Sequence, residues 1–182
     1  DADTLAALPQ RWTRGTDCGG GGTTRDVDWP PYQRVGPGPA VAAQRLCRIA
    51  KDFQSRAKLW KQTGGVHACA LADGEGILLF TEDIGRHNAF EKIMGRALLE
   101  EIDVADKFVL MTGRVSAQIV SKAAACGAAM LVSRSAVTDL GIKLARRFGI
   151  TLVGFLRGRR LNVYTGHERV TGDPGGQADN TP

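Results

Sequence analysis

The feature that most constrains the fold is a regular alternation of apolar strands and amphipathic helices in the second half of the chain. Short apolar runs predict strands at 107–111, 130–132, 150–156 and 161–164, with helices over 116–126 and 137–148. Strands that alternate with helices pair mostly in parallel, because each helix returns the chain to the same edge of the sheet. The alternation therefore predicts a largely parallel sheet covered by helices.

The preceding part of the chain predicts two helices and two further strands. A helix is expected over 40–61, where apolar residues recur at helical spacing. These residues are Val41, Leu46, Ile49, Phe53, Ala57 and Trp60. Strands at 66–71 and 77–80 are expected to form a hairpin, because Asp73-Gly74 stands between them and Asp-Gly favours tight turns. The other helix is predicted over 86–101.

The length of the chain, 182 residues, suits one well-buried domain. Three segments are predicted: a flexible Gly/Pro-rich segment over 1–39 that includes the Cys18 loop, an α/β domain over 40–170, and a disordered polar tail over 171–182. The abrupt start, followed by an early run of glycines, predicts that an upstream segment is missing.

Charge and composition narrow the classes of partner. The net charge of +5 and the pI of about 9.3 favour anionic partners. The 6% of aromatic residues is too small and scattered a set for a nucleic-acid stacking platform, so no nucleic acid is expected. No apolar run approaches the roughly 20 residues that cross a bilayer, and no membrane association is expected. Four cysteines without a CxxC pair favour a reducing, cytoplasmic setting.

Three loops are expected at the carboxyl edge of the sheet, where ligands of such folds gather. They are 81–88, 112–116 and 133–135, and each offers hydroxyl groups, an arginine or backbone N–H groups to an anion. The candidate ligand-binding residues in them are Asp83, Gly85, Arg86, His87, Arg114, Ser116 and Ser135. For a single residue such as Asp83, Ser116 or Ser135, helix capping is the more ordinary interpretation. Taken together, the loops predict an anion site.

A second candidate is the turn after the strand at 150–156. It consists of Phe155, Leu156, Arg157, Gly158, Arg159 and Arg160. Three guanidinium groups around a glycine suit bidentate binding of phosphate. The alternative is a basic turn that is simply solvated.

Cys18 is the candidate reactive residue. It lies among glycines, with Arg14 and Arg25 near in sequence. A positive neighbourhood lowers the pKa of a thiol and enriches the nucleophilic thiolate, which then accepts sulfur as a persulfide. The alternative is an incidental cysteine in a linker. The other cysteines fall in predicted helices or strands, where small buried side chains are expected.

Ordered motifs then point to a known family. From Leu46 to Val170 the chain resembles the formate dehydrogenase accessory sulfurtransferases, the FdhD family. The motifs are Thr63-Gly64-Gly65-Val66-His67, Glu82-Asp83-Ile84-Gly85-Arg86-His87, Arg114-Val115-Ser116, Lys122 with Cys126-Gly127, Leu152-Val153-Gly154-Phe155 and Val163-Tyr164-Thr165, preceded by Asp17-Cys18-Gly19. Several ordered motifs over some 120 residues are far more specific than any one of them.

The resemblance implies a fold and an activity. The fold is expected to be a three-layer α/β/α sandwich with a mixed, largely parallel sheet, similar to the cytidine deaminases. The family implies a sulfur carrier that accepts sulfur as a cysteine persulfide from a cysteine desulfurase. It then transfers the sulfur to the bis-molybdopterin guanine dinucleotide form of the molybdenum cofactor, which formate dehydrogenase needs. A homodimer is also implied, and no metal ligated by the protein.

By position in the motifs, Cys18 resembles the family's persulfide cysteine, and Phe155 to Arg160 its phosphate-binding turn. Two departures stand out. The family's usual Cys-Gly-x-Cys-Gly has Gly21 in place of its second cysteine here, so no partner thiol is available for an internal disulfide. The family's N-terminal β-rich portion is also absent from this sequence.

The sequence bears on two alternative functions. A chaperone that binds the molybdenum cofactor without sulfur transfer is compatible with the loss of the second cysteine. A zinc deaminase needs His-x-Glu and Pro-Cys-x-x-Cys, whereas the nearest stretch here is His67-Ala68-Cys69 and no Pro-Cys-x-x-Cys occurs. The sequence therefore argues against deaminase chemistry.

Overall fold

The computed structural model describes residues 34–172 and, before them, two short strands. The chain divides into two compact units, residues 1–31 and 32–182. In the first, β1 (Thr13–Arg14) and β2 (Gly22–Thr23) pair antiparallel. Cys18, the candidate persulfide residue, lies between them in sequence and outside the described residues.

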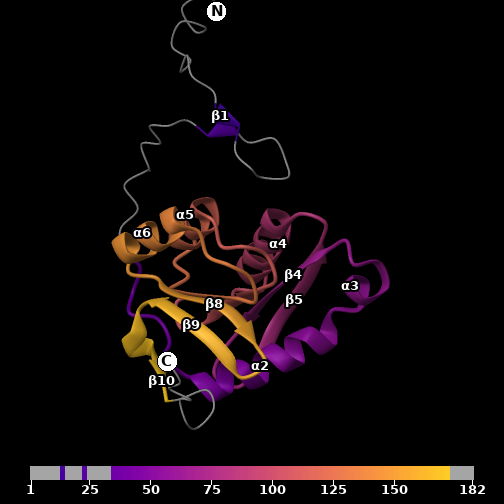
Figure 1. Cartoon of the computed structure of the whole chain (residues 1–182), viewed down its shortest axis with the longest axis horizontal. Helices are drawn as coiled ribbons and strands as arrows, with labels where there is room; N and C mark the ends of the chain where they lie inside the picture. Colours follow the sequence, from indigo (N-terminus) through magenta and orange to yellow (C-terminus); the bar gives the residue numbers. More distant parts are fainter. Residues whose placement is uncertain (1–12, 15–21, 24–33, 173–182) are drawn as a thin grey trace, which may run out of the picture. The chain divides into compact units, whose positions relative to one another are not determined.

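A six-stranded sheet forms the centre of the second unit (Figure 1). Its strands are β4 (His67–Ala72), β5 (Ile77–Asp83), β6 (Phe108–Met111), β7 (Met130–Ser133), β8 (Thr151–Arg157) and β9 (Arg160–Thr165), in the spatial order β5-β4-β6-β7-β8-β9. The pairs β6–β7 and β7–β8 are parallel, and the other pairs are antiparallel. Strands β5, β6, β7 and β8 therefore point in one direction, and β4 and β9 point in the opposite direction. This arrangement confirms the predicted mixed α/β sheet.

Helices cover both faces of this sheet, as Figure 1 shows. They are α2 (Ala43–Arg56), α3 (Lys58–Thr63), α4 (Arg86–Leu99), α5 (Ala117–Ala125) and α6 (Asp139–Phe148). Helix α2 lies on one face, whereas α4, α5 and α6 lie on the other. The predicted three layers are confirmed, while the likeness to cytidine deaminases stays a prediction. No helix among the described residues combines the length and the apolar character needed to span a bilayer.

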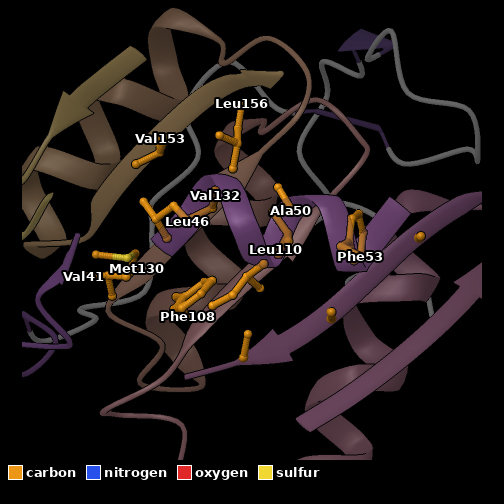
Figure 2. Close-up of a cluster of buried hydrophobic side chains, with 14 residues drawn as sticks. Val41, Leu46, Ala50, Phe53, Phe108, Leu110, Met130, Val132, Val153 and Leu156 are labelled. Atoms are coloured by element: carbon orange, nitrogen blue, oxygen red, sulfur yellow. The ribbon is translucent and has the colours of Figure 1, made fainter. Parts of the chain in front are cut away.

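The core beneath α2 explains why this helix packs on the sheet (Figure 2). Leu46, Ala50 and Phe53 recur at spacings of three and four residues, so they share one face of the helix. They contact alternate residues of the strands, such as Leu110 and Val132, whose side chains point to the same face. Each large side chain buried in this way stabilises the fold by about 1.5–3 kcal/mol.

Two short strands close the unit at its ends. β3 (Val41–Ala42) pairs in parallel with β10 (Val170–Thr171), which follows the short 3-10 helix η1 (His167–Arg169). β3 occupies the start of the segment predicted as helix, and β10 includes Thr171, the first residue of the segment predicted as a disordered tail.

The prediction of one helix over 40–61 is wrong, because the helix breaks at Ala57. There the backbone leaves helical geometry, with ψ of 72°. The backbone N–H groups of Leu59 and Trp60 then donate to the carboxylate of Glu82, at 3.0 and 2.8 Å. Glu82 thereby caps the first turn of α3 from a distant strand. Helical periodicity cannot predict such a contact, because the contact joins residues more than 20 positions apart in the sequence.

Candidate functional site

A cavity of about 460 Å³ opens at the carboxyl edge of the parallel strands. It is lined by Trp60, Gly64, Gly65, Val66, His67, Thr112, Arg134, Ser135 and Arg157. Thr112 follows β6, Arg134 follows β7 and Arg157 ends β8, so neighbouring strands deliver these polar side chains to one place. The position agrees with the general placement of ligands in open α/β sheets. We call this space the edge cavity.

Two arginines, Arg134 and Arg157, give the edge cavity its charge. Arg157 Nε donates to the carbonyl oxygen of Arg134 at 3.1 Å. With the Gln54 amide turned so that its oxygen faces Arg134, that oxygen accepts from Nε and Nη2 of Arg134 at 3.0 and 3.1 Å. Burial, and then the charge of Arg157, lower the pKa of Arg134. Within the described part of the chain, neither guanidinium forms an ion pair with a carboxylate.

A bulge in β8 places Arg157. The register of β8 against β9 shifts between Gly154 and Arg157, and Phe155 takes a φ of 52°. That left-handed conformation is uncommon for a residue with a side chain, and such strain is often found at functional sites. The N–H of Phe155 donates to the carbonyl oxygen of Ser135 at 3.0 Å. The bulge therefore ties the end of β8 to the loop that carries Arg134 and Ser135.

His67 lies in the wall of the edge cavity, half-buried at the start of β4. Its Nδ1 is 3.3 Å from the hydroxyl oxygen of Thr112, which also accepts from the backbone N–H of Ala68 at 3.0 Å. Burial lowers the pKa of His67, and the positive charges of Arg86 and Arg114 lower it further. The lowered pKa favours the neutral form of the imidazole. The effect of Arg86 and Arg114 on His67 also shows that these two arginines lie near this side of the cavity.

Arg86 is almost completely buried, with 6% of its surface exposed. Its stem passes over Gly113: a Cβ atom added at Gly113 would lie 2.7 Å from Cβ of Arg86. Only glycine therefore leaves room for Arg86 beside the loop after β6. Arg86 and Arg114 do not line the edge cavity, but they add to its positive potential.

Asp83 builds the turn into α4 and does not line the edge cavity. Its Oδ1 accepts from the backbone N–H of Gly85 at 2.9 Å and from Nδ2 of Asn88 at 3.1 Å. It also forms an ion pair with Lys92. The hydrogen bond from Lys92, followed by that from Gly85, lowers the pKa of Asp83 to about 2. These contacts make Asp83 part of a local turn before α4, whose N-cap residue Gly85 receives no side-chain cap.

His87 and Ser116 also lie outside the cavity lining. His87 Nδ1 is 3.4 Å from Nζ of Lys122, which forms an ion pair with Glu91, so His87 belongs to the contact between α4 and α5. Ser116 precedes α5, but its hydroxyl does not cap that helix. The oxygen is buried and has no hydrogen-bond partner in the described residues.

The predicted basic turn divides between the cavity and other surroundings. Arg157 lines the edge cavity, whereas Leu156 is fully buried in the core against α2. The side chain of Leu156 therefore cannot face a ligand in this structure. Arg159 lies close enough to Cys47 of α2 to influence its thiol. Gly158, with φ of 60°, makes the turn, and Arg160 pairs with Arg157 across it.

Among the described residues, Cys69 is fully buried and Cys47 is half-buried, and burial raises the pKa of both thiols, which disfavours their thiolates. Cys126 is exposed as a residue, although partial desolvation of its thiol raises its pKa as well. No group of three or more His, Cys, Asp and Glu residues in the described ranges is placed to hold a metal ion.

Sequence reasoning missed several residues of the edge cavity. Arg134 stood inside a predicted ligand loop, between Ser133 and Ser135, so its position was a usable indication. The sequence pattern gives His67 no ligand role and places Thr112 only within a loop. Trp60 had been assigned to the apolar face of a continuous helix, and only the break at Ala57 brings it to the cavity.

Two other cavities accompany this one. The first, of about 330 Å³, shares Trp60, Thr112 and Arg134 with the edge cavity and adds Lys51 and Lys61. We call it the adjoining cavity. The second, of about 270 Å³, lies where β8 begins, at the opposite edge of the sheet, and contains Arg34, Arg146 and Arg169. These three are the lining arginines of that opposite cavity.

The fold and the edge cavity define a three-layer α/β domain with a cationic pocket at the carboxyl edge of its sheet. The sequence profile of the FdhD/NarQ family matches residues 3–171. The chain therefore belongs to the FdhD/NarQ family, which confirms the resemblance found in its motifs.

Individual relatives agree with this assignment. The chain is 41% identical over 131 residues to a protein of Bacillus pumilus named "Sulfur carrier protein FdhD", and 46% identical over 131 residues to one of the same name from Listeria monocytogenes. Each match covers 72% of this chain and 50% of the relative. The chain thus spans about half the length of these curated relatives.

A solved structure also matches. It is a crystal structure from Desulfotalea psychrophila described as that of a formate dehydrogenase accessory protein, with a TM-score of 0.72 and 31% sequence identity. The match covers 77% of this chain and 60% of the other.

Proposed function

We propose that this protein is a sulfur carrier for the molybdenum cofactor of formate dehydrogenase. Cys18 accepts sulfur as a persulfide from a cysteine desulfurase, and the sulfur passes to the bis-molybdopterin guanine dinucleotide form of the cofactor. The relatives named as sulfur carriers and the neighbour described as a formate dehydrogenase accessory protein support this proposal. The proposal includes a cytoplasmic location, which the cysteine content favours, and a homodimer, which the family resemblance implies.

The observation that carries the proposal is the unpaired positive charge of the edge cavity. Arg134 and Arg157 stand side by side, and no carboxylate of the described residues neutralises them. Two like charges held together are costly unless an anion joins them. The pyrophosphate of a dinucleotide supplies such an anion and matches the planar donor pattern of a guanidinium.

The other proposed site residues have roles around this grip. Arg86 and Arg114 add to the positive electrostatic potential of the edge cavity. Ser135 and Thr112 offer hydroxyl groups in the lining that also contains Arg134 and Arg157. The bulge at Phe155 fixes the position of Arg157.

The sulfur step is a displacement at sulfur. The Cys18 thiolate attacks the terminal sulfur of a persulfide on the desulfurase, a new S–S bond forms at Cys18, and the donor's S–S bond breaks to release its thiolate. No oxidant or reductant is needed, since one thiolate replaces another. Cys18 is the natural candidate because Cys69 is fully buried and Cys47 half-buried, with raised pKa values, and the pKa of the exposed Cys126 is raised as well.

The test is the intact mass of the full chain after incubation with a cysteine desulfurase and cysteine. We expect a gain of one sulfur that a reductant removes, absent in Cys18→Ala and retained in Cys126→Ala. Cys126 is a matched control because it is the exposed cysteine of the described residues. A gain that persists in Cys18→Ala would overturn the role of Cys18.

A second candidate function is a chaperone that binds the cofactor without sulfur chemistry. It is favoured by Gly21, which replaces the second cysteine of the family's usual pair. A chain that binds guanine nucleotide but gains no sulfur in the mass experiment would establish this alternative.

A further inference from the structure

We infer that Trp60 is an aromatic platform on which the planar ring of a nucleotide stacks, and that Glu82 positions it. The inference rests on the proposed function, because it assumes that the edge cavity binds a nucleotide through Arg134 and Arg157. It adds the residue that recognises the ring, where the arginines recognise the phosphates.

The exposure of Trp60 is the first observation. Trp60 is 47% exposed, although an indole ring is among the side chains that gain most from burial. It belongs to a helix of six residues, α3, none of which is buried. The ring is therefore presented to solvent by a small element that contributes little to the core.

The position of Trp60 is the second observation. Trp60, Thr112 and Arg134 line both the edge cavity and the adjoining cavity, so Trp60 stands where the two spaces meet. The volumes, about 460 and 330 Å³, lie within the usual range of small-molecule sites. A ligand held by its phosphates at Arg134 has the ring of Trp60 within the same cavity wall.

The support of α3 is the third observation. Both carboxylate oxygens of Glu82 accept backbone N–H groups of the first turn, one of them that of Trp60 itself. At the other end, Gly64 adopts φ of 64° and its N–H donates to the carbonyl oxygen of Trp60 at 2.7 Å. The backbone of Trp60 is thus fixed on both sides while its side chain stays exposed. Such preorganisation suits a binding residue.

The chemistry of the lining selects the kind of ligand. Beside Trp60, the backbone of Gly64 and Gly65 carries no side chains and lies in the cavity wall, which gives a flat ring close access to peptide groups. Stacking of a base on an aromatic side chain is a recurrent source of affinity and depends little on which base is present. A nucleoside diphosphate therefore matches the platform together with the arginines.

Calorimetric titration of the full chain with GDP, and separately with inorganic pyrophosphate, tests this assignment. Pyrophosphate carries the phosphates and lacks the ring. We expect Trp60→Leu to weaken GDP binding at least about fivefold and to leave pyrophosphate binding unchanged. Trp60→Phe keeps a ring and should lose less affinity. Leu59→Ala is the matched control, since Leu59 is an exposed neighbour on α3 outside both cavities.

A spectroscopic readout accompanies the titration. Stacking on guanine should quench part of the tryptophan fluorescence in the wild-type chain, and Trp60→Phe should abolish that quenching. For Glu82 we expect Glu82→Ala to weaken GDP binding and reduce the quenching, with pyrophosphate binding retained. Glu75→Ala is the control for Glu82, because Glu75 is an exposed glutamate that, within the described chain, forms an ion pair with Arg45 of α2 and not a contact with α3.

The outcomes separate the two proposals. If Trp60→Leu leaves GDP binding intact while changes at Arg134 and Arg157 weaken it, the platform is overturned and the cofactor site stands. Equal losses for GDP and pyrophosphate in Trp60→Leu would also overturn stacking, because the phosphate grip would then be what changed. If the wild-type chain binds neither ligand, the nucleotide site and the platform both fail.

Discussion

The two edges of the sheet carry similar residues and use them differently. At the opposite edge, Nη1 of Arg169 donates to the carbonyl oxygens of Gly149 and Ala129, at 3.0 and 3.4 Å, and to the hydroxyl of Thr151 at 3.3 Å. At the carboxyl edge, Arg134 and Arg157 lie beside each other, and both line the edge cavity.

The difference lies in what the donors meet. Carbonyl oxygens at the C-terminal end of α6 carry partial negative charge and attract a cation, so Arg169 stabilises the fold. The carboxyl edge offers Arg134 a second arginine instead, and the resulting surplus of charge is available to a ligand. We therefore propose that the same residue type serves stability at one edge and binding at the other.

The largest expected effect is a loss of ligand affinity at the carboxyl edge. In the double variant Arg134→Gln with Arg157→Gln, we expect the Kd for GDP to rise about 100-fold, because two charge-assisted hydrogen-bonding groups are lost. Arg146→Gln, at the opposite cavity, is the matched control and should leave the Kd unchanged. An equal loss in the control would mean that overall charge, and not the edge cavity, governs binding.

The next effect concerns the structural side. Arg169→Met should lower the free energy of unfolding by about 2–3 kcal/mol, because carbonyl groups near the end of α6 lose a charged donor. Chemical denaturation measures this change, and GDP titration should show unaltered affinity. Altered affinity without loss of stability would contradict the division between the two edges.

A third variant tests how the bulge holds Arg157. A Cβ atom at Gly154 would lie 2.8 Å from Cγ2 of Val137 and 2.9 Å from Cε2 of Tyr164. Gly154→Ala is expected to cost about 1–3 kcal/mol of stability through overpacking and to weaken GDP binding by displacing the bulge. Gly158→Ala is the comparison, since an added Cβ there meets nothing within 4 Å, although its φ of 60° carries some strain of its own.

The smallest effect is a pH dependence at His67. Because burial, and then the charges of Arg86 and Arg114, lower the pKa of His67 in the folded chain, protonation favours the unfolded state. Neutral His67 contributes fully to the free energy of unfolding above about pH 6.5, the pKa of an unperturbed histidine. That contribution is lost as the pH falls through the lowered pKa of His67 in the folded chain. His67→Gln should flatten the fall in thermal midpoint between pH 7 and 5. An unchanged slope would show that His67 does not titrate in this range.

Much of the second unit was predictable because its patterns are local. The hairpin at Asp73-Gly74 forms as expected, and Asp73 Oδ1 accepts the N–H groups of Glu75 and Gly76 at 2.7 and 2.9 Å. The helix predicted over 86–101 is found as Arg86–Leu99. Such elements follow from turn chemistry and from periodicity over a few residues.

The site was predictable to the level of its loops and not of its residues. Ser135 and Arg157, predicted in two separate candidate sites, both line the edge cavity, whereas Asp83 builds a turn and Leu156 enters the core. Two adjacent side chains of a strand point to opposite faces, and a bulge changes which one faces the edge. The sequence of the Phe155 to Arg160 turn does not reveal where that bulge falls.

The sequence by itself determined the family, the order of strands and helices, and the edge of the sheet at which polar loops gather, because each depends on short-range patterns. The tertiary structure alone decided that α3 is separate from α2, and that Trp60 and Arg134 line the edge cavity. It also decided that Arg159 lies near Cys47 of α2 and not in the lining of that cavity. Those outcomes depend on contacts between residues far apart in the chain, such as that of Glu82 with the backbone of Trp60. Contacts of this kind form only after the sheet has brought their partners together.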